Sequence, residues 1–252
     1  GKVLSVGTAG GEFIVSQGDN NSPLSPTNTR VVRQTTFGSA AVTPPQVGNS
    51  VLFLQRASRK IREYVYQFES DAYTAPDLAI LSEHITEGGI IDMAYQQEPD
   101  SVVWMARTDG VLVGMTYERA QDVIGWHRHI IGGTDAKIES VAVIPNTTAT
   151  ADDLWAIVQR TINGTSVKYI EFMTHGLPEG DTNTVNATYL DSMLSYDGNP
   201  VSSLSGLDHL EGQTVSVLAD GATHPVRTVS SGAITLNDSY SVVHVGLPYI
   251  ST

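Results

Sequence analysis

The chain has 252 residues, no cysteine, and 27 acidic against 14 basic side chains, which gives a formal net charge of −13 at pH 7. This length can bury one or two hydrophobic cores, and the lack of cysteine excludes disulfide frameworks, zinc–thiolate sites and thiol nucleophiles. The acidic balance disfavours tight binding to nucleic acid or to anionic lipid, because both need clustered Lys and Arg. We interpret the charge primarily as a device for solubility.

The sequence contains no run of about 18 apolar residues that would cross a membrane, and no charged segment followed by an apolar one that would mark a secretory signal. We therefore expect no membrane contact. The first residue is Gly1, and the residues after it have the pattern of a strand. We expect the chain to be an excised piece of a longer protein.

A recurring hairpin pattern is the strongest indication of the fold. Two runs of β-branched and apolar residues flank the pair Asp109-Gly110, and Gly tolerates the positive φ that a tight hairpin turn requires. Similar hairpins surround positions that follow one another in steps of 49, 51 and 53 residues, namely Gly7, Arg56, Arg107 and Arg160. A tyrosine follows the three arginines by 10, 10 and 9 residues. A hairpin that returns every ~50 residues is typical of β-propeller blades, which have roughly 40 to 50 residues and four strands each.

The first two predicted blades begin near the N-terminal end. We expect strands over residues 3–6, 13–16 and 30–36, and then a hairpin formed by residues 51–56 and 61–68. The glycine-rich segment from Gly7 to Gly11 lacks both the Lys-Ser/Thr pair and the following helix of a phosphate-binding loop. We therefore predict a hairpin turn there.

Residues 75–85 are the best candidate for a helix. Pro76 suits the first turn of a helix, Asp77 suits its positive N-terminal end, and apolar side chains recur on one face. Since this is the single helix that we predict in the chain, the predicted fold class is all-β.

The next two blades have four predicted strands each. We expect them over residues 90–96, 102–107, 111–117 and 123–130, and then over residues 138–144, 154–160, 167–173 and 189–196. Apolar and polar residues alternate incompletely in these strands, as expected when both faces of a blade pack against neighbours. We predict a partial β-propeller of about four blades over residues 1–198.

A different pattern begins after the turn formers at 197–200. Short predicted strands lie near residues 226–229, 234–236 and 242–249, separated by glycine turns. This spacing does not match the repeat of ~50 residues and is typical of a small, curled barrel. We predict a small β-barrel-like domain over residues 199–252.

Two groups of residues could suggest metal binding or catalysis. His127 and His129 are two apart on a predicted strand and would share a face, but no carboxylate is adjacent, so we favour a packed or edge-strand pair over a metal site. Asp208, His209 and Glu211 could form an acid/base group, or a turn into a strand. Because no nucleophile motif accompanies them, we favour the turn.

Two further groups could bind a ligand. The basic residues of one predicted hairpin tip could meet phosphate or an acidic partner, or could form a solvated hairpin end; they are Arg56, Arg59, Lys60 and Arg62. Trp104, Trp126 and Trp155 could stack on sugars, although aromatic residues on buried strands more often belong to the core. The clustered acids of a sugar hydrolase are not evident. We predict no catalytic, cofactor-binding or metal-binding residues, and no enzymatic activity.

Several short motifs occur in an order that resembles a known family. They are Gly7-Thr8-Ala9-Gly10-Gly11-Glu12-Phe13, Val51-Leu52-Phe53-Leu54-Gln55-Arg56, Tyr73-x-x-Pro76-Asp77-Leu78 with Glu83-His84, Val103-Trp104 with Asp109-Gly110, and Gly206-Leu207-Asp208-His209-Leu210-Glu211-Gly212. Together they resemble the tail hub or nozzle (tail tubular protein B-like) proteins of tailed bacteriophages over nearly the whole chain. The last segment is similar to a small β-barrel insertion named after the first catalytic cysteine half-domain of ubiquitin-activating enzymes. The name implies no catalysis here, since the chain has no cysteine.

The resemblance implies a structural role in the virion. It implies self-association in a ring, usually of six, that contacts the tail adaptor and the tail fibre or needle proteins, after synthesis in the host cytoplasm. DNA would leave through the lumen without specific binding, and an acidic wall would repel its phosphates. One alternative is a carbohydrate-binding or depolymerising tail protein that recognises host surface glycan. Another is a propeller scaffold for protein partners outside any virus.

Overall fold

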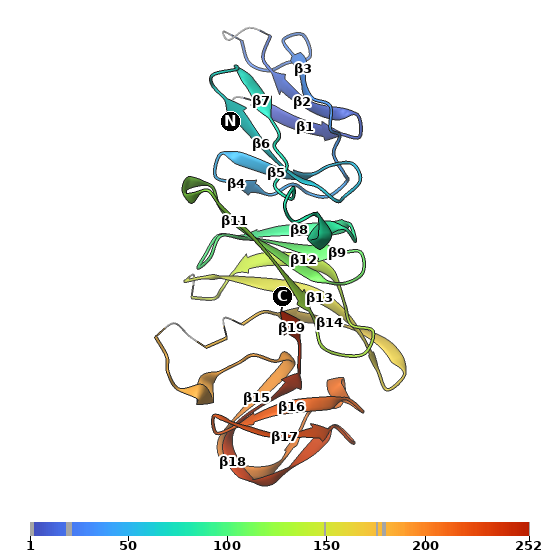
Figure 1. Cartoon of the computed structure of the whole chain (residues 1–252), viewed down its shortest axis with the longest axis vertical. Coiled ribbons are helices and arrows are strands. Elements are labelled where there is room, and N and C mark those ends of the chain that lie inside the picture. Colours follow the sequence, from blue (N-terminus) through green and yellow to red (C-terminus); the bar gives the residue numbers. More distant parts are fainter. Residues whose placement is uncertain (1–2, 19–21, 149, 175, 178–179, 252) are drawn as a thin grey trace.

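The structure, a computed structural model, describes residues 3–18, 22–148, 150–174, 176–177 and 180–251. These residues form an all-β protein, as predicted, in which antiparallel strands build five small sheets and none of the five closes into a barrel. Four sheets follow one another along the longest axis in chain order, and the fifth lies beyond the fourth (Figure 1). Within the described residues, no helix is long and apolar enough to span a membrane.

The first sheet has the order β1-β2-β3, with bounds Leu4–Thr8, Gly11–Ser16 and Arg30–Thr35. The segment between β1 and β2 is the predicted hairpin turn. The Thr8 hydroxyl donates to the Gly11 carbonyl at 2.8 Å and accepts from the Gly10 N–H at 3.3 Å. Gly11 has a φ of +150°, and a Cβ there would lie 2.5 Å from the Thr35 carbonyl oxygen, so β3 can approach only glycine at this point.

The second sheet has the order β4-β5-β6-β7, with bounds Gln46–Val47, Ser50–Leu54, Ile61–Gln67 and Ala72–Thr74. The predicted hairpin is confirmed by β5 and β6, which pair in an antiparallel register. The outer strands β4 and β7 have only 2 and 3 residues. Strands this short carry no periodic signal, which is why the sequence does not predict them.

The helix predicted over residues 75–85 is wrong for most of its length. Helix α1 covers only Glu83–Thr86. Residues 75–78 run beside β6: the Leu78 N–H donates to the Ile61 carbonyl at 2.9 Å, and the Asp77 carboxylate accepts from the Ala79 N–H at 3.0 Å. A turn then leads into α1, in which the Ser82 N–H donates to the Ala79 carbonyl at 2.8 Å. The bonds to β6 take the place of helical hydrogen bonds. The bond from Ala79 to the Asp77 side chain also competes with a helix, as is usual for Asp.

The third sheet has the order β8-β9-β10-β11-β19, with bounds Ile90–Gln96, Val102–Arg107, Leu112–Glu118, Val123–Ile130 and Ile250–Ser251. A short 3-10 helix, η1, covers Arg119–Gln121 between β10 and β11. The hairpin at Asp109-Gly110 is confirmed, since the Gly110 N–H donates to the Arg107 carbonyl at 2.8 Å and Gly110 has a φ of +92°. The fifth strand, β19, comes from the far end of the chain and pairs with β11.

The fourth sheet has three strands in the order β12-β13-β14, with bounds Lys137–Pro145, Asp152–Ile162 and Thr165–Phe172. These strands confirm three of the four that were predicted for the fourth blade. The strand predicted over residues 189–196 is not part of this sheet. It is the beginning of β15, which pairs with β18 in the C-terminal sheet.

The C-terminal sheet has the order β15-β18-β16-β17, with bounds Asp191–Ser205, Ala233–Leu247, Thr214–Ala219 and Ala222–Thr228. Two 3-10 helices, η2 (Thr184–Asn186) and η3 (Asp208–Leu210), precede β15 and β16. Strand β15 continues through residue 198, the predicted boundary, because its pairing with β18 shifts register between Asp197 and Val201 and so accommodates the turn formers. The strands predicted over 234–236 and 242–249 are one continuous strand, β18. The order of the four strands has no pairing between β15 and β17, so the sheet is open and does not form the predicted barrel.

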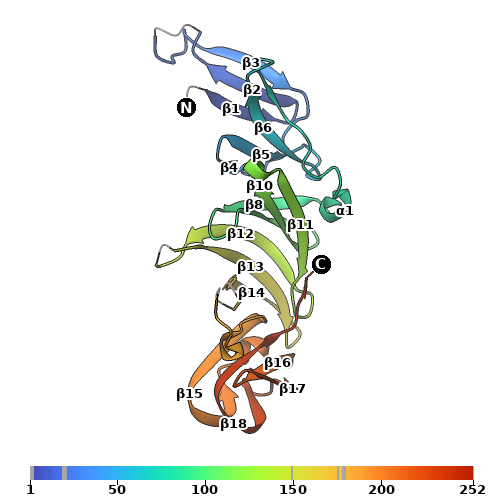
Figure 2. The same ribbon diagram turned by 60° about the vertical axis from the view of Figure 1, so that its left-hand side comes forward.

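The four successive sheets pack face to face through separate hydrophobic clusters (Figure 2). Strand β9 shows the arrangement: Val103 and Met105 point toward the second sheet, whereas Val102 and Trp104 point toward the fourth. The C-terminal sheet has a cluster of its own. Because the internal sheets bury both faces, their strands are apolar on both sides, which explains the incomplete alternation in the sequence.

Candidate functional site

The outer face of the first sheet is apolar and uncovered. The ladder places five apolar side chains on this face, together with the exposed Arg33 opposite Phe13. We call the five apolar residues the first-sheet face: Leu4, Val6, Phe13, Val15 and Val31. The opposite face contains Ile14, which is buried against the second sheet. Leu4 and Val31 keep 58% and 59% of their surface exposed, so no other part of the described chain covers them.

The outer face of the fourth sheet has the same character. Its ladder brings together five large apolar side chains, which we call the fourth-sheet face: Ile144, Trp155, Ile157, Ile170 and Phe172. The rings of Trp155 and Phe172 lie 5.1 Å apart between centroids. Ile170 is 74% exposed and Phe172 53%, whereas Leu154 and Val158, on the opposite face, are buried against the third sheet.

The first and fourth sheets have three strands each, whereas the second has four and the third has five. A strand precedes the hairpin in the second and third sheets (β4, β8), but β1 begins its sheet and pairs only with β2. A strand follows the hairpin in both of these sheets (β7, β11), but β14 pairs only with β13. Among the described residues, the edges of β1 and β14 therefore carry backbone groups with no neighbouring strand, an arrangement that permits pairing with a further strand.

A cleft of about 760 Å³ opens beside the edge of β14. Trp104 and His129 of the third sheet line one wall, Tyr169 of the fourth sheet lines another, and Tyr249 and Asp191 come from the C-terminal segment. The cleft therefore combines aromatic surface with a few polar groups, a composition suited to small organic ligands.

A buried ionic cluster joins the cleft to the C-terminal sheet. Arg160 is 1% exposed; it forms an ion pair with Glu171 and donates to the Gly132 carbonyl at 2.7 Å. The Asp191 carboxylate accepts from the Gly132 N–H at 2.6 Å, and burial raises the pKa of Asp191 to about 6. The Ser192 hydroxyl donates to Glu171 at 2.9 Å. These bonds hold the beginning of β15 against the fourth sheet.

The two histidines of β11 form a packed pair, as the sequence favours. His127 Nδ1 and His129 Nε2 are 2.8 Å apart, and both rings contact Trp104. Burial lowers the pKa of both, that of His129 to about 4 with a further contribution from His127. In the part of the chain that the structure describes, no third His, Cys, Asp or Glu completes a metal-binding group.

The carboxylates of Asp208 and Glu211 both lie beside Gly232, whereas His209 makes its hydrogen bond elsewhere. The Glu211 carboxylate accepts from the backbone N–H groups of Ser231 and Gly232 at 3.0 and 2.7 Å, which fixes a turn. His209 Nε2 donates to the Ser192 carbonyl at 3.1 Å, and its ring contacts Tyr169. Glu211 thus has the turn-fixing role that the sequence suggests for this segment.

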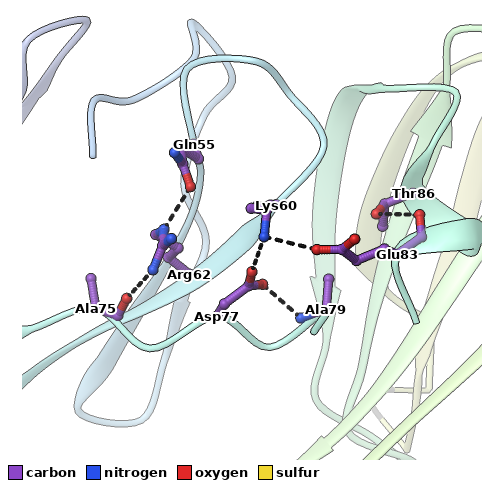
Figure 3. Close-up of polar contacts among 8 residues, drawn as sticks. All are labelled: Gln55, Lys60, Arg62, Ala75, Asp77, Ala79, Glu83 and Thr86. Atoms are coloured by element: carbon purple, nitrogen blue, oxygen red, sulfur yellow. Dashed lines mark hydrogen bonds and ion pairs between the residues drawn. The ribbon is translucent and has the colours of Figure 1, made fainter. Parts of the chain in front are cut away.

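The basic hairpin tip divides into two parts. Lys60 Nζ lies 2.8 Å from both Asp77 and Glu83, and Arg62 donates to the Ala75 carbonyl at 2.6 Å and to Gln55 (Figure 3). These two cations therefore hold the segment before α1 against the second sheet. The guanidinium of Arg62 also lies over the ring of Phe37, 3.4 Å from its centroid.

The other two cations of the tip, Arg56 and Arg59, are exposed. Arg59 approaches Glu87 at 3.8 Å. The description of the tip as a solvated hairpin end is thus right for these two residues and wrong for Lys60 and Arg62.

The three tryptophans lie in three different places. Trp104 is 6% exposed and donates to Gln96 at 2.6 Å at the cleft wall. Trp126 donates to the Leu78 carbonyl at 3.3 Å, between the third sheet and the segment before α1. Trp155 belongs to the fourth-sheet face. They form no common platform for a sugar.

No protein-family model matches the chain, and no curated protein is similar to it. The resemblance to tail hub and nozzle proteins therefore stays a prediction.

Proposed function

We propose that the chain is a structural subunit of a bacteriophage tail hub or nozzle, which builds an oligomeric ring through which DNA is ejected. The observation that carries this proposal is the pair of uncovered apolar faces, one on the first sheet and one on the fourth. Contiguous apolar surface of this kind marks protein contact sites. In a propeller such faces are covered by further blades of the same polypeptide or by neighbouring subunits, so sheets of this kind are suited to a larger assembly.

In this proposal the four successive sheets are blades of a partial propeller. Their hairpins β1–β2, β5–β6, β9–β10 and β13–β14 return at the spacing of the sequence repeat. The sheets also stack face to face in chain order, which is how blades pack around a common axis. The curled C-terminal sheet is the small barrel-like module of the family resemblance.

The charge distribution supports passage of DNA without specific binding. The net charge is −13, and several basic side chains are already engaged with carboxylates, among them Lys60, Arg107, Arg119, Arg160 and Lys168. Acidic side chains outnumber basic ones by 27 to 14, so the chain would repel phosphates and DNA would slide past without adhering. The proposed protein partners are further copies in a ring of six, the tail adaptor, and the tail fibre or needle proteins, in a virion assembled from subunits made in the host cytoplasm.

Electron microscopy of negatively stained phage particles labelled with antibody against this chain tests the proposal. We expect label at the end of the tail that is distal to the portal. Label on the capsid or along fibres, or no label on any particle, would contradict it.

A second candidate function, recognition of host surface glycan, is supported by the aromatic cleft beside β14. Sugars stack on exposed aromatic rings, and Tyr189 and Tyr249, at its rim, are 55% and 36% exposed. A glycan array probed with the whole chain would show saturable binding that Tyr189→Ala and Tyr249→Ala abolish. A chain that binds no glycan on the array would exclude this candidate.

A further inference from the structure

We propose that a cleft between the first and second sheets binds a small organic carboxylate through Arg62. The cleft has a volume of about 600 Å³ and opens where β3 meets β7. Gln34 of β3, Phe37, Arg62 of β6 and Tyr73 of β7 are among the residues that line it. The inference does not depend on the proposed function, since it concerns a different surface of the molecule.

Arg62 is a buried cation without an ionic partner. Its side chain belongs to a residue that is only 9% exposed, yet it forms no ion pair among the described residues. The other deeply buried arginine, Arg160, is paired with Glu171. Burial lowers the pKa of Arg62, and the more distant charges of Asp77 and Glu12 oppose this shift. A buried charge that lacks a counter-ion is costly, so an anion in the cleft would relieve the cost.

One arm of the Arg62 guanidinium is available to a ligand. Its Nε donates to the Gln55 side chain at 2.8 Å, and its Nη1 donates to the Ala75 carbonyl at 2.6 Å (Figure 3). In the part of the chain that the structure describes, Nη2 has no hydrogen-bond partner and keeps contact with solvent. The Phe37 ring lies against the guanidinium, 3.4 Å from its centroid, and so fixes the plane of the group. An arginine held in this way is a strong donor to a carboxylate.

Gln34 supplies a second donor to the same cleft. Its side-chain carbonyl accepts from the Tyr73 N–H at 3.2 Å, so its NH2 group is left to donate to a ligand. The Tyr73 ring is fixed in turn by stacking on Tyr64, with 4.8 Å between centroids. The cleft therefore combines a cation and an amide donor with the ring surfaces of Phe37 and Tyr73. This combination suits an anion that is attached to an apolar body.

The charges near the cleft favour an anion with a single negative charge. The chain has a net charge of −13, and Asp77 and Glu12 already act on Arg62. A doubly charged phosphate would meet twice the repulsion from these groups, and one guanidinium would not neutralise it. A carboxylate has one charge and matches the geometry of the guanidinium. The favoured ligand is therefore a carboxylate with an aromatic or other apolar group.

The test is a titration of the whole chain with benzoate, acetate and inorganic phosphate at constant ionic strength, followed by NMR of the arginine side-chain Nε–H groups. Benzoate joins one carboxylate to one aromatic ring. We expect it to shift the Arg62 signal saturably, with a Kd on the order of 1 mM, as is usual for so small a ligand. Acetate lacks the ring and phosphate has the wrong charge, so we expect both to bind about tenfold more weakly.

Two variants test the assignment to this cleft. Gln34→Glu keeps the acceptor for the Tyr73 N–H and places a carboxylate in the cleft, so benzoate binding is expected to weaken by about tenfold or more. Arg62→Gln removes the cation and is expected to do the same. Because Arg62→Gln also removes the bond to the Ala75 carbonyl, Gln34→Glu gives the answer if Arg62→Gln is unfolded.

Arg59→Gln is the matched control. Arg59 belongs to the same hairpin, its side chain is 52% exposed, and it does not line the cleft. Its loss removes the same charge and is expected to leave benzoate binding unchanged. Four results would overturn the inference: no saturable shift with benzoate, phosphate binding as tight as that of benzoate, a Gln34→Glu variant that binds as the wild type does, or equal weakening by Arg59→Gln.

Discussion

The carboxylate of Asp191 accepts a hydrogen bond from the backbone N–H of Gly132 at 2.6 Å, which ties the beginning of β15 to the loop after β11. The same Gly132 offers its carbonyl to the buried guanidinium of Arg160. One short loop thus receives a charged group from each side. Stability at this junction depends on the protonation state of Asp191.

Asp191→Asn is expected to change how stability varies with pH. Burial raises the pKa of Asp191 in the folded state to about 6, above its unfolded value of about 3.9. The folded state therefore holds the proton more tightly, and the contribution of Asp191 to stability falls as pH rises from about 4 to about 6. The amide keeps an acceptor for Gly132 and removes the charge. We expect the variant to match the wild type near pH 4 and to exceed it at pH 7 by up to about 2 kcal/mol.

Urea unfolding at pH 4, 5, 6 and 7 measures this difference. Since other carboxylates titrate in both proteins, only the difference between variant and wild type reports on Asp191. A difference that does not vary with pH would show that Asp191 titrates normally in the folded protein.

His129 is expected to stay neutral at pH 6. Burial against Trp104 lowers its pKa to about 4, below the unfolded value of about 6.5. Its contribution to stability is therefore complete above pH 6.5 and is lost as pH falls toward 4, the opposite direction to Asp191. Heteronuclear NMR of the imidazole nitrogens between pH 3.5 and 8 gives the midpoint directly. A midpoint above 6 would mean that the ring is solvated and unpacked from Trp104.

Arg160→Ala is expected to destabilise the protein by about 3 kcal/mol, because it leaves the partly buried Glu171 without its cation and the Gly132 carbonyl without its donor. The matched control is Lys168→Ala on the neighbouring strand. Lys168 pairs with Glu139 at 2.7 Å but is 59% exposed, so its loss is expected to cost less than about 1 kcal/mol. Chemical denaturation measures the free energy of unfolding of each variant relative to the wild type. Equal losses would mean that burial does not distinguish the two ion pairs.

Gly114→Ala is expected to destabilise the third sheet by about 2 kcal/mol through overpacking. A Cβ at Gly114 would lie 2.0 Å from His127 Cε1 and would push that ring away from Trp104. Gly125, on the next strand, is the control, because a Cβ there would meet only the Thr116 side chain at an ordinary 3.8 Å. Gly125→Ala is expected to be neutral in the same thermal unfolding experiment. A neutral Gly114→Ala would show that His127 is free to move.

The sequence predicts the middle of the fold better than its ends. Strands β8, β9 and β11 have the predicted bounds, because each is long, β-branched or aromatic, and bounded by turn formers. Strand β19 has two residues and gains its partner from a strand more than a hundred residues earlier, so no local pattern marks it. The helix predicted over 75–85 failed because pairing with β6 outweighed local helical periodicity.

The candidate site is less predictable than the strands that build it. Incomplete alternation in the sequence indicates that the strands of this sheet carry apolar residues on both faces, but not that one of these faces lacks a covering sheet. The positions of Ile170 and Phe172 become informative only when their exposure is known. Likewise, the sequence shows the basic cluster at the hairpin tip, whereas its partners Asp77 and Glu83 become apparent only through folding.

The C-terminal sheet begins and ends at one place. Asp191, where β15 enters, is paired with Leu247, where β18 leaves, and both lie against Gly132. The C-terminal sheet is therefore inserted between β14 and β19, with its two ends side by side, an arrangement typical of inserted modules. A change within the C-terminal sheet therefore need not alter the four stacked sheets.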